Sequence, residues 1–79
     1  MEVTVRLHVS LTKFLPEGAR EKTVSVRLPE GAEVADIADQ LKIPARYVKL
    51  IFVNGGRANK QTRLSDGDQV SLFPPVGGG

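Results

Sequence analysis

The apolar residues of this chain repeat at helical spacing in one extended stretch and at strand spacing in several others. The helical stripe, at positions i, i+3, i+4 and i+7, consists of Val34, Ile37, Ala38 and Leu41. Residues 2–10 and 22–28 instead alternate apolar and polar side chains, as half-buried strands do. With 79 residues the chain has room for one small domain, so the helix must bury its stripe against a sheet.

The second half of the chain adds three more strand candidates. Residues 49–53 form an almost continuous apolar run, which predicts a central strand buried on most of both faces. Residues 54–56 (NGG) are a turn signal, and residues 57–58 follow as a short return strand. Residues 69–73 alternate again. The order is strand, strand, helix, strand, short strand, strand.

This order predicts an α+β fold. The first two strands are expected to pair antiparallel. If the first and last strands pair in parallel at the centre, the fold is a β-grasp, the ubiquitin-like roll: a mixed sheet of four to five strands with one main helix packed on one face. We expect residues 1–73 to form this domain and residues 74–79 to form a C-terminal tail.

The composition excludes several chemistries. The chain has no cysteine, so a disulfide, a zinc ribbon, an iron–sulfur cluster and a cysteine nucleophile are ruled out. The single histidine, His8, cannot form a histidine metal site or a Ser/His/Asp triad alone. Asp66 and Asp68 flank Gly67 and are interpreted as turn residues, because two carboxylates fall short of a calcium loop. We expect no metal, no bound cofactor and no catalysis by the chain alone.

The charge and the N-terminus indicate which partners to expect. Residues 40–65 contain no acid but six basic side chains, which could attract an acidic partner. The net charge is only +2 and aromatic residues are 5% of the chain, which argues against nucleic acid. The first residues lack the basic start and apolar block of a signal peptide, and no apolar run could span a bilayer. We therefore expect a cytoplasmic protein with no membrane partner.

The C-terminal tail carries the chemistry that the rest of the chain lacks. Pro74 and Pro75 have no backbone donor, so they end the last strand and stiffen the chain behind it. Gly77, Gly78 and Gly79 have no side chains and could enter a tunnel closed to bulkier residues. The reactive group at this end is the carboxylate of Gly79, which adenylation would make electrophilic. A terminus without function is the alternative interpretation.

Residues 72–79 (LFPPVGGG) resemble the C-terminal signature of the sulfur carriers related to the small subunit of molybdopterin synthase. The turn at residues 64–70 (LSDGDQV) and the opening strand with its following apolar cluster are also similar to that family.

The resemblance implies a cycle that partner proteins run. A ubiquitin-activating-like enzyme would use ATP to adenylate Gly79, and a sulfur donor protein would convert the adenylate to a thiocarboxylate. The large subunit of molybdopterin synthase, or an equivalent acceptor, would then take the tail. Alternatives are delivery of sulfur for thiamine or tRNA thiolation, conjugation through Gly79 as a ubiquitin-like modifier, and a binding module without catalysis.

Docking requires a surface near the tail. In the alternating pattern His8 and Phe73 point away from the helix on neighbouring strands, and we place Ile51 with them. Together with Pro74, Pro75 and Val76 at the start of the tail, these are the candidate partner-binding residues.

Overall fold

The computed structural model describes residues 1–75. The strands are β1 (Glu2–Leu7), β2 (Thr23–Arg27), β3 (Leu50–Val53), β4 (Gly56–Ala58) and β5 (Gln69–Phe73). The helices are α1 (Val34–Leu41) and two 3-10 helices, η1 (Val9–Phe14) and η2 (Ala45–Tyr47). The predicted order of strands and helix is confirmed.

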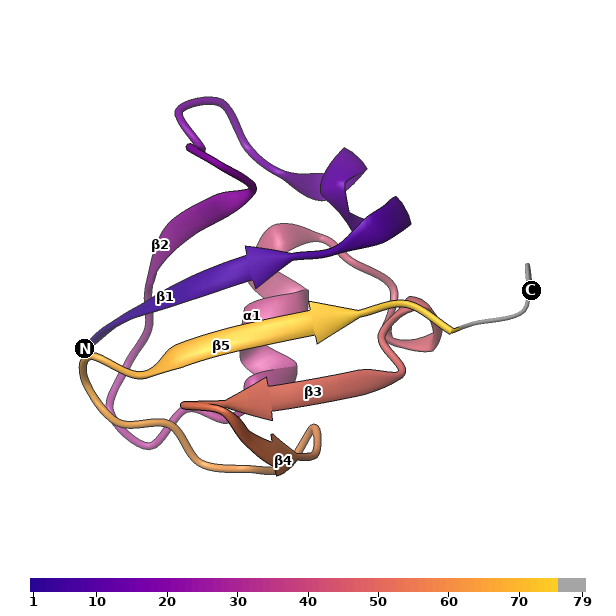
Figure 1. Ribbon diagram of the computed structural model, residues 1–79. Helices are drawn as coiled ribbons and strands as arrows, with labels where there is room; N and C mark the ends of the chain where they lie inside the picture. The colour runs from indigo at the N-terminus through magenta and orange to yellow at the C-terminus, as the bar shows by residue number, and fades with distance from the viewer. Residues whose placement is uncertain (76–79) are drawn as a thin grey trace.

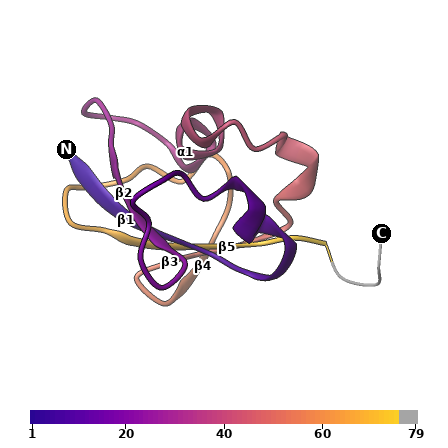
Figure 2. The ribbon, with the colours of Figure 1, turned by 90° about the horizontal axis from the view of Figure 1, so that it is seen from above.

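The strands form a five-stranded mixed sheet in the order β2-β1-β5-β3-β4 (Figure 1). β1 pairs antiparallel with β2 and parallel with β5, and β3 pairs antiparallel with both β5 and β4. The parallel pair places the first and last strands side by side at the centre, as the sequence predicts. Figure 2 shows α1 covering one face of the sheet and leaving the other open. The predicted β-grasp architecture is confirmed.

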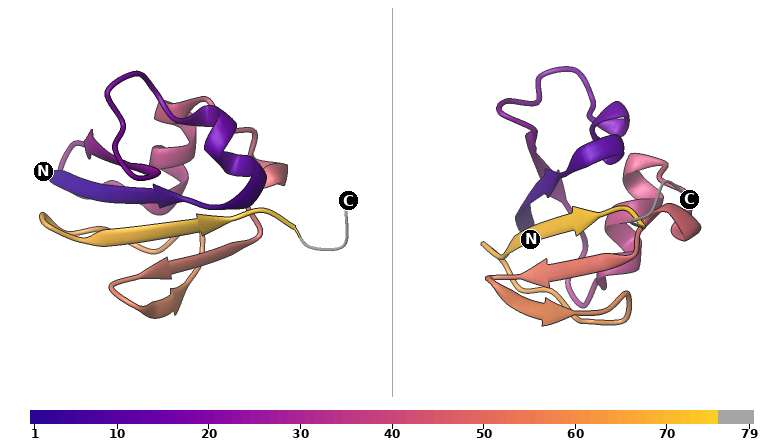
Figure 3. Two further views of the ribbon diagram at one scale, coloured as in Figure 1. Left: turned by 45° about the horizontal axis from the view of Figure 1, so that its top comes forward. Right: turned by 45° about the vertical axis from the view of Figure 1, so that its right-hand side comes forward.

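The core lies between α1 and the sheet. Every second side chain of β1 and β5 points into it, because successive side chains of a strand alternate between faces. Buried residues from these two strands are Val3, Val5, Leu7, Val70 and Leu72. The helix contributes Val34, Ile37 and Ala38 from its apolar stripe. Burying a side chain of this size stabilises the fold by about 1.5–3 kcal/mol for valine, leucine or isoleucine. Figure 3 shows the two layers from other sides.

Short-range hydrogen bonds set both ends of α1. At the start, the Asp36 carboxylate accepts a hydrogen bond from the Glu33 backbone N–H at 2.8 Å, which is half of a capping box. At the end, Lys42 adopts a left-handed conformation with φ of 61°, and the N–H of Ile43 donates to the Ala38 carbonyl at 2.8 Å. Pro44 follows and prevents the helix from continuing.

β1 is shorter than the predicted strand of residues 2–10. The chain turns after His8 because Val9 has a positive φ of 54°, which a strand cannot contain. Residues Val9–Phe14 then form η1. A β-branched residue rarely adopts this conformation, and the Val9 side chain is 72% exposed. After this turn η1 lies beside the ends of β1 and β5 and contacts both strands.

The prediction that residues 49–53 form a strand buried on both faces is wrong. In β3 only Ile51 is buried, whereas Leu50, Phe52 and Val53 are partly exposed. The central position belongs to β5, which lies between β1 and β3. Within residues 1–75 no helix covers the open face of the sheet (Figure 2), and side chains on that face, such as Phe52, are partly exposed.

Candidate functional site

The candidate site begins where β1 and β5 end together. Since these strands run parallel, their C-terminal ends lie at the same edge of the sheet (Figure 1). There the N–H of His8 donates to the Leu72 carbonyl at 3.2 Å, and the N–H of Lys49 donates to the Phe73 carbonyl at 2.9 Å. Pro74 and Pro75 carry no N–H, so they cannot extend this ladder. The hydrogen-bonded pairing of β5 therefore ends at Phe73, and we call Pro74 and Pro75 the tail root.

Four side chains form an apolar group on the open face beside this point, which we call the sheet-face cluster: His8, Leu50, Phe52 and Phe73. The rings of His8 and Phe73 stack with centroids 4.0 Å apart and planes 10° apart. Phe52 meets Phe73 edge to face, with centroids 5.9 Å apart and an 82° angle. Leu50 lies directly opposite Phe73 in the β3–β5 register. All four side chains are partly exposed.

Cations surround the cluster and act on His8. Arg57 lies opposite Phe52 on β4, and Arg6 precedes His8 on the same face of β1. Burial lowers the pKa of His8 below 6.5, and the positive charges of Arg6 and Lys22 lower it further. The His8 Nε2 atom is buried and has no hydrogen-bond partner among residues 1–75. A neutral ring stacked on Phe73 therefore contributes to the cluster as an apolar surface.

Ile51 does not belong to this face, which corrects the sequence-based assignment. It is 3% exposed and lies opposite Leu72, whose side chain is in the core. Its neighbours Leu50 and Phe52 take the open face instead, because side chains alternate along β3. The sequence analysis missed both residues. The alternation of side chains along residues 50–53 could have identified them. Once Phe73 is placed on the open face and paired with Leu50, Phe52 must lie on that face too.

The predicted site residues thus fall into three groups. The structure brings His8 and Phe73 together on the open face and places Pro74 and Pro75 immediately beyond the sheet. It removes Ile51 from that face. Val76, Gly77, Gly78 and Gly79 lie outside the described residues.

The carboxylates near the other end of the sheet have structural partners. Asp66 accepts a hydrogen bond from the Glu2 N–H at 2.7 Å. Asp68 accepts from the Ser65 N–H at 2.8 Å and from the Asn54 side-chain amide at 2.9 Å. Both aspartates are engaged in holding the turn, as the sequence analysis expects. Within residues 1–75 no group of three or more histidine, cysteine, aspartate or glutamate side chains is arranged to hold a metal ion.

The helices of the described residues are all too short to cross a bilayer. Among the residues described, the candidate functional groups are those of the tail root and the sheet-face cluster.

A mixed sheet in the order β2-β1-β5-β3-β4 with one helix on one face defines a ubiquitin-like β-grasp protein. The chain belongs to the Mut7-C ubiquitin family, whose sequence model matches residues 1–77. A search of curated proteins finds no match. The expected relationship to the ubiquitin-like β-grasp sulfur carriers is confirmed by this family and by solved structures.

Three solved structures illustrate the range of similar proteins. The H. volcanii small archaeal modifier protein 1 is 25% identical, with a TM-score of 0.73 over 95% of this chain and 98% of that one. A complex of subunits 1 and 2 of the molybdopterin-converting factor from Helicobacter pylori 26695 contains a chain 26% identical, with a TM-score of 0.60. The thiamine biosynthesis protein ThiS from Geobacter metallireducens is also 26% identical, with a TM-score of 0.60. Each of the last two matches covers 100% of both chains.

Proposed function

We propose that this protein is a sulfur carrier whose working group is the carboxyl of Gly79, and that it serves molybdopterin biosynthesis. The observation that carries the proposal is the position of the tail root directly after the last strand. β5 ends at Phe73 beside the sheet-face cluster, and two prolines follow outside the sheet. In this proposal residues 1–73 are a docking domain and residues 74–79 are the part that enters partner active sites.

The proposed chemistry has two steps on Gly79. First, a carboxylate oxygen attacks the α-phosphorus of ATP held by an activating enzyme, and pyrophosphate leaves. Second, hydrosulfide (HS⁻) delivered by a donor protein attacks the carbonyl carbon, the carbon–oxygen bond to AMP breaks, and AMP and a proton leave. The product is a thiocarboxylate. This chain supplies neither the ATP site nor a thiol, since it contains no cysteine.

The partners in this proposal are an adenylating enzyme, a sulfur donor and an acceptor such as the large subunit of molybdopterin synthase. The sheet-face cluster suits docking, because removing one phenylalanine side chain from water is worth about 1.5–3 kcal/mol. The complex of subunits 1 and 2 in H. pylori supports a two-protein arrangement of this kind.

Two other functions have a specific observation in their favour. Likeness to a small archaeal modifier protein favours conjugation of Gly79 to lysine side chains of other proteins. Likeness to ThiS favours a sulfur carrier that serves thiamine synthesis. Transfer of sulfur to tRNA uses the same carrier chemistry, and a binding module with an inert tail uses none of it.

Mass spectrometry of the protein purified from its own cells separates these functions. A thiocarboxylate on Gly79, seen as the mass increase when sulfur replaces one oxygen, supports the carrier. Peptides with the tail branched from a lysine support the modifier. An unmodified carboxylate in every growth condition, or a chain that continues beyond Gly79, overturns the proposal. Growth of a deletion strain on media that require molybdoenzymes, or that lack thiamine, then identifies the pathway.

A further inference from the structure

A groove of about 510 Å³ lies beside the tail root, separate from the sheet-face cluster. η1 forms one wall, η2 forms another, and Pro74 and Pro75 close the side next to the tail. Figure 2 shows η1 and η2 on the same side of the sheet as α1. The sheet-face cluster lies on the opposite face, because its strand residues alternate with the buried Ile51 and Leu72. The groove lining is Ser10, Leu11, Lys13, Phe14, Arg46, Tyr47, Pro74 and Pro75.

Two cations lie over the aromatic rings of this groove. The Lys13 Nζ is 5.5 Å from the centroid of Phe14 and 5.4 Å from that of Tyr47. The Arg46 guanidinium carbon is 4.8 Å from the centroid of Tyr47. Neither cation forms an ion pair with a carboxylate of residues 1–75. No acidic side chain of that part of the chain lines the groove. The groove thus combines an apolar floor with two cations that have no described counter-charge.

We propose that this groove binds an acidic segment of the partner protein that receives the tail. The inference rests on the proposed function, because the groove and the tail share Pro74 and Pro75. A protein that encloses residues 76–79 must pass close to the groove. Lys13 and Arg46 would pair with its carboxylates while its aliphatic side chains cover the partly exposed Phe14 and the prolines. The lack of an acidic side chain among the described lining residues strengthens this charge complementarity.

The geometry favours an acidic peptide over nucleic acid. A base would need a free ring face for stacking. Here Lys13 lies over both rings and Arg46 lies over Tyr47, and the two rings meet at 44° with centroids 6.1 Å apart. Carboxylates need only reach the two cations from outside, which leaves the rings as they are.

The chain contains a built-in probe for this groove. Tyr47 is its only tyrosine and it has no tryptophan, so intrinsic fluorescence reports on the groove itself. The test titrates the full chain with a short acetylated peptide that alternates glutamate and leucine. A matched peptide carries glutamine in place of glutamate, and a single-stranded oligonucleotide is the third probe.

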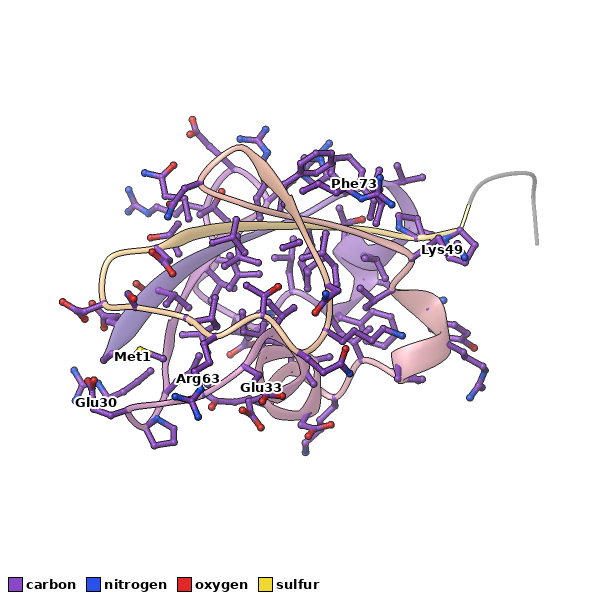
Figure 4. The ribbon with its side chains drawn as sticks, turned by 90° about the horizontal axis from the view of Figure 1, so that it is seen from below. Met1, Glu30, Glu33, Lys49, Arg63 and Phe73 are labelled. Carbon is purple, nitrogen blue, oxygen red and sulfur yellow. The ribbon has the colours of Figure 1, made fainter. Side chains whose placement is uncertain are left out.

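Variants show whether the two cations are responsible. We expect Lys13→Glu/Arg46→Glu to weaken binding of the acidic peptide at least about fivefold, from the loss of two partly exposed ion pairs and their replacement by repulsion. Arg63→Glu makes the same kind of charge change at the opposite end of the molecule, near Met1 (Figure 4), and should leave affinity unchanged. Circular dichroism confirms that each variant is folded.

The proposal is overturned if the acidic peptide does not bind, or if the glutamine peptide binds equally well. It is also overturned if Arg63→Glu weakens binding as much as the double variant, or if the oligonucleotide binds more tightly than the peptide. This titration needs neither ATP nor sulfur. A groove that does not bind the acidic peptide is therefore distinguishable from a chain that carries no sulfur. The mass of the intact protein tests the carrier proposal, and the titration tests the groove.

Discussion

The His8 ring stacks on the Phe73 ring with centroids 4.0 Å apart. This contact is possible because β1 and β5 pair directly, with no other strand between them. The first strand of the chain therefore supports the last residue of β5 directly. A substitution at His8 therefore changes the packing of Phe73, the last residue before the tail. This contact links the stability of the fold to the presentation of the tail.

Replacing His8 with phenylalanine should make stability less dependent on pH. Because the pKa of His8 is lowered in the folded protein, the unfolded chain binds more protons below about pH 6.5, and stability falls as the pH falls through that region. Thermal unfolding at about pH 7.5 and pH 5.5 measures this loss. We expect a smaller loss in His8→Phe. Equal losses in the two proteins would contradict the assignment.

Replacing Val9 with asparagine should stabilise the fold. Val9 has a φ of 54°, and a left-handed conformation costs a non-glycine residue about 1–2 kcal/mol, less for asparagine. We expect a gain of about 1 kcal/mol in the free energy of unfolding, measured by urea denaturation. Val9→Thr is the control, since it keeps the β-branch and should change little. A gain in Val9→Thr as large as in Val9→Asn would show that strain is not the cause.

Replacing Asp66 with alanine should destabilise the domain without touching the tail. The change removes the hydrogen bond from the Glu2 N–H at 2.7 Å, which is worth about 1 kcal/mol. For a domain of this size that lowers Tm by about 4–8 °C. Asp39 is exposed on α1, and Asp39→Ala should shift Tm far less. Similar shifts in both variants would contradict a specific role for Asp66.

Replacing Phe52 with serine should weaken docking. The variant removes one ring from the sheet-face cluster, and its burial by a partner is worth about 1.5–3 kcal/mol, so affinity should fall about tenfold or more. Calorimetric titration with the large subunit of a molybdopterin synthase measures the change. Ser25→Ala, on an exposed position of β2, should bind as the parent does. Unchanged affinity in Phe52→Ser would exclude the cluster from that interface.

Changes in the glycine tail should abolish activation but not folding. Deletion of Gly79 removes the proposed reactive carboxyl, and Gly78→Trp adds bulk that a narrow tunnel cannot admit. The free energy of unfolding should stay the same, because the buried residues of the described part of the chain lie between Val3 and Leu72. Exchange of pyrophosphate into ATP by an activating enzyme measures adenylation, and Gly78→Ala should lose less activity than Gly78→Trp. Normal exchange with the Gly79 deletion would contradict the role of that carboxyl.

Periodicity predicted the strands and the helix well, because each element of this small domain has one buried side. The alternation of Val3, Val5 and Leu7 describes a strand with one face in the core, and the structure buries all three. The helical stripe of residues 34–41 coincides with α1. Such patterns are local, so one sequence is enough to detect them.

The errors arose where long-range pairing decides the outcome. The four consecutive apolar residues at 50–53 include no polar position to mark the two faces of the strand, and only the pairing of Ile51 with Leu72 assigns them. The left-handed turn at Val9 was equally invisible, since valine disfavours it. The groove likewise unites Lys13 and Arg46, which are far apart in the chain and meet only through the fold.

The central parallel pair has a practical consequence for working with this protein. Met1 lies at one end of the sheet and the described chain ends at the other, so the two ends point in opposite directions (Figure 1). The Met1 amine donates to the Leu28 carbonyl at 2.8 Å, and the same nitrogen keeps one N–H for this bond when a residue is joined to it. Affinity tags, fluorophores and surface anchors belong in front of Met1, where they do not block the proposed reactive carboxyl of Gly79.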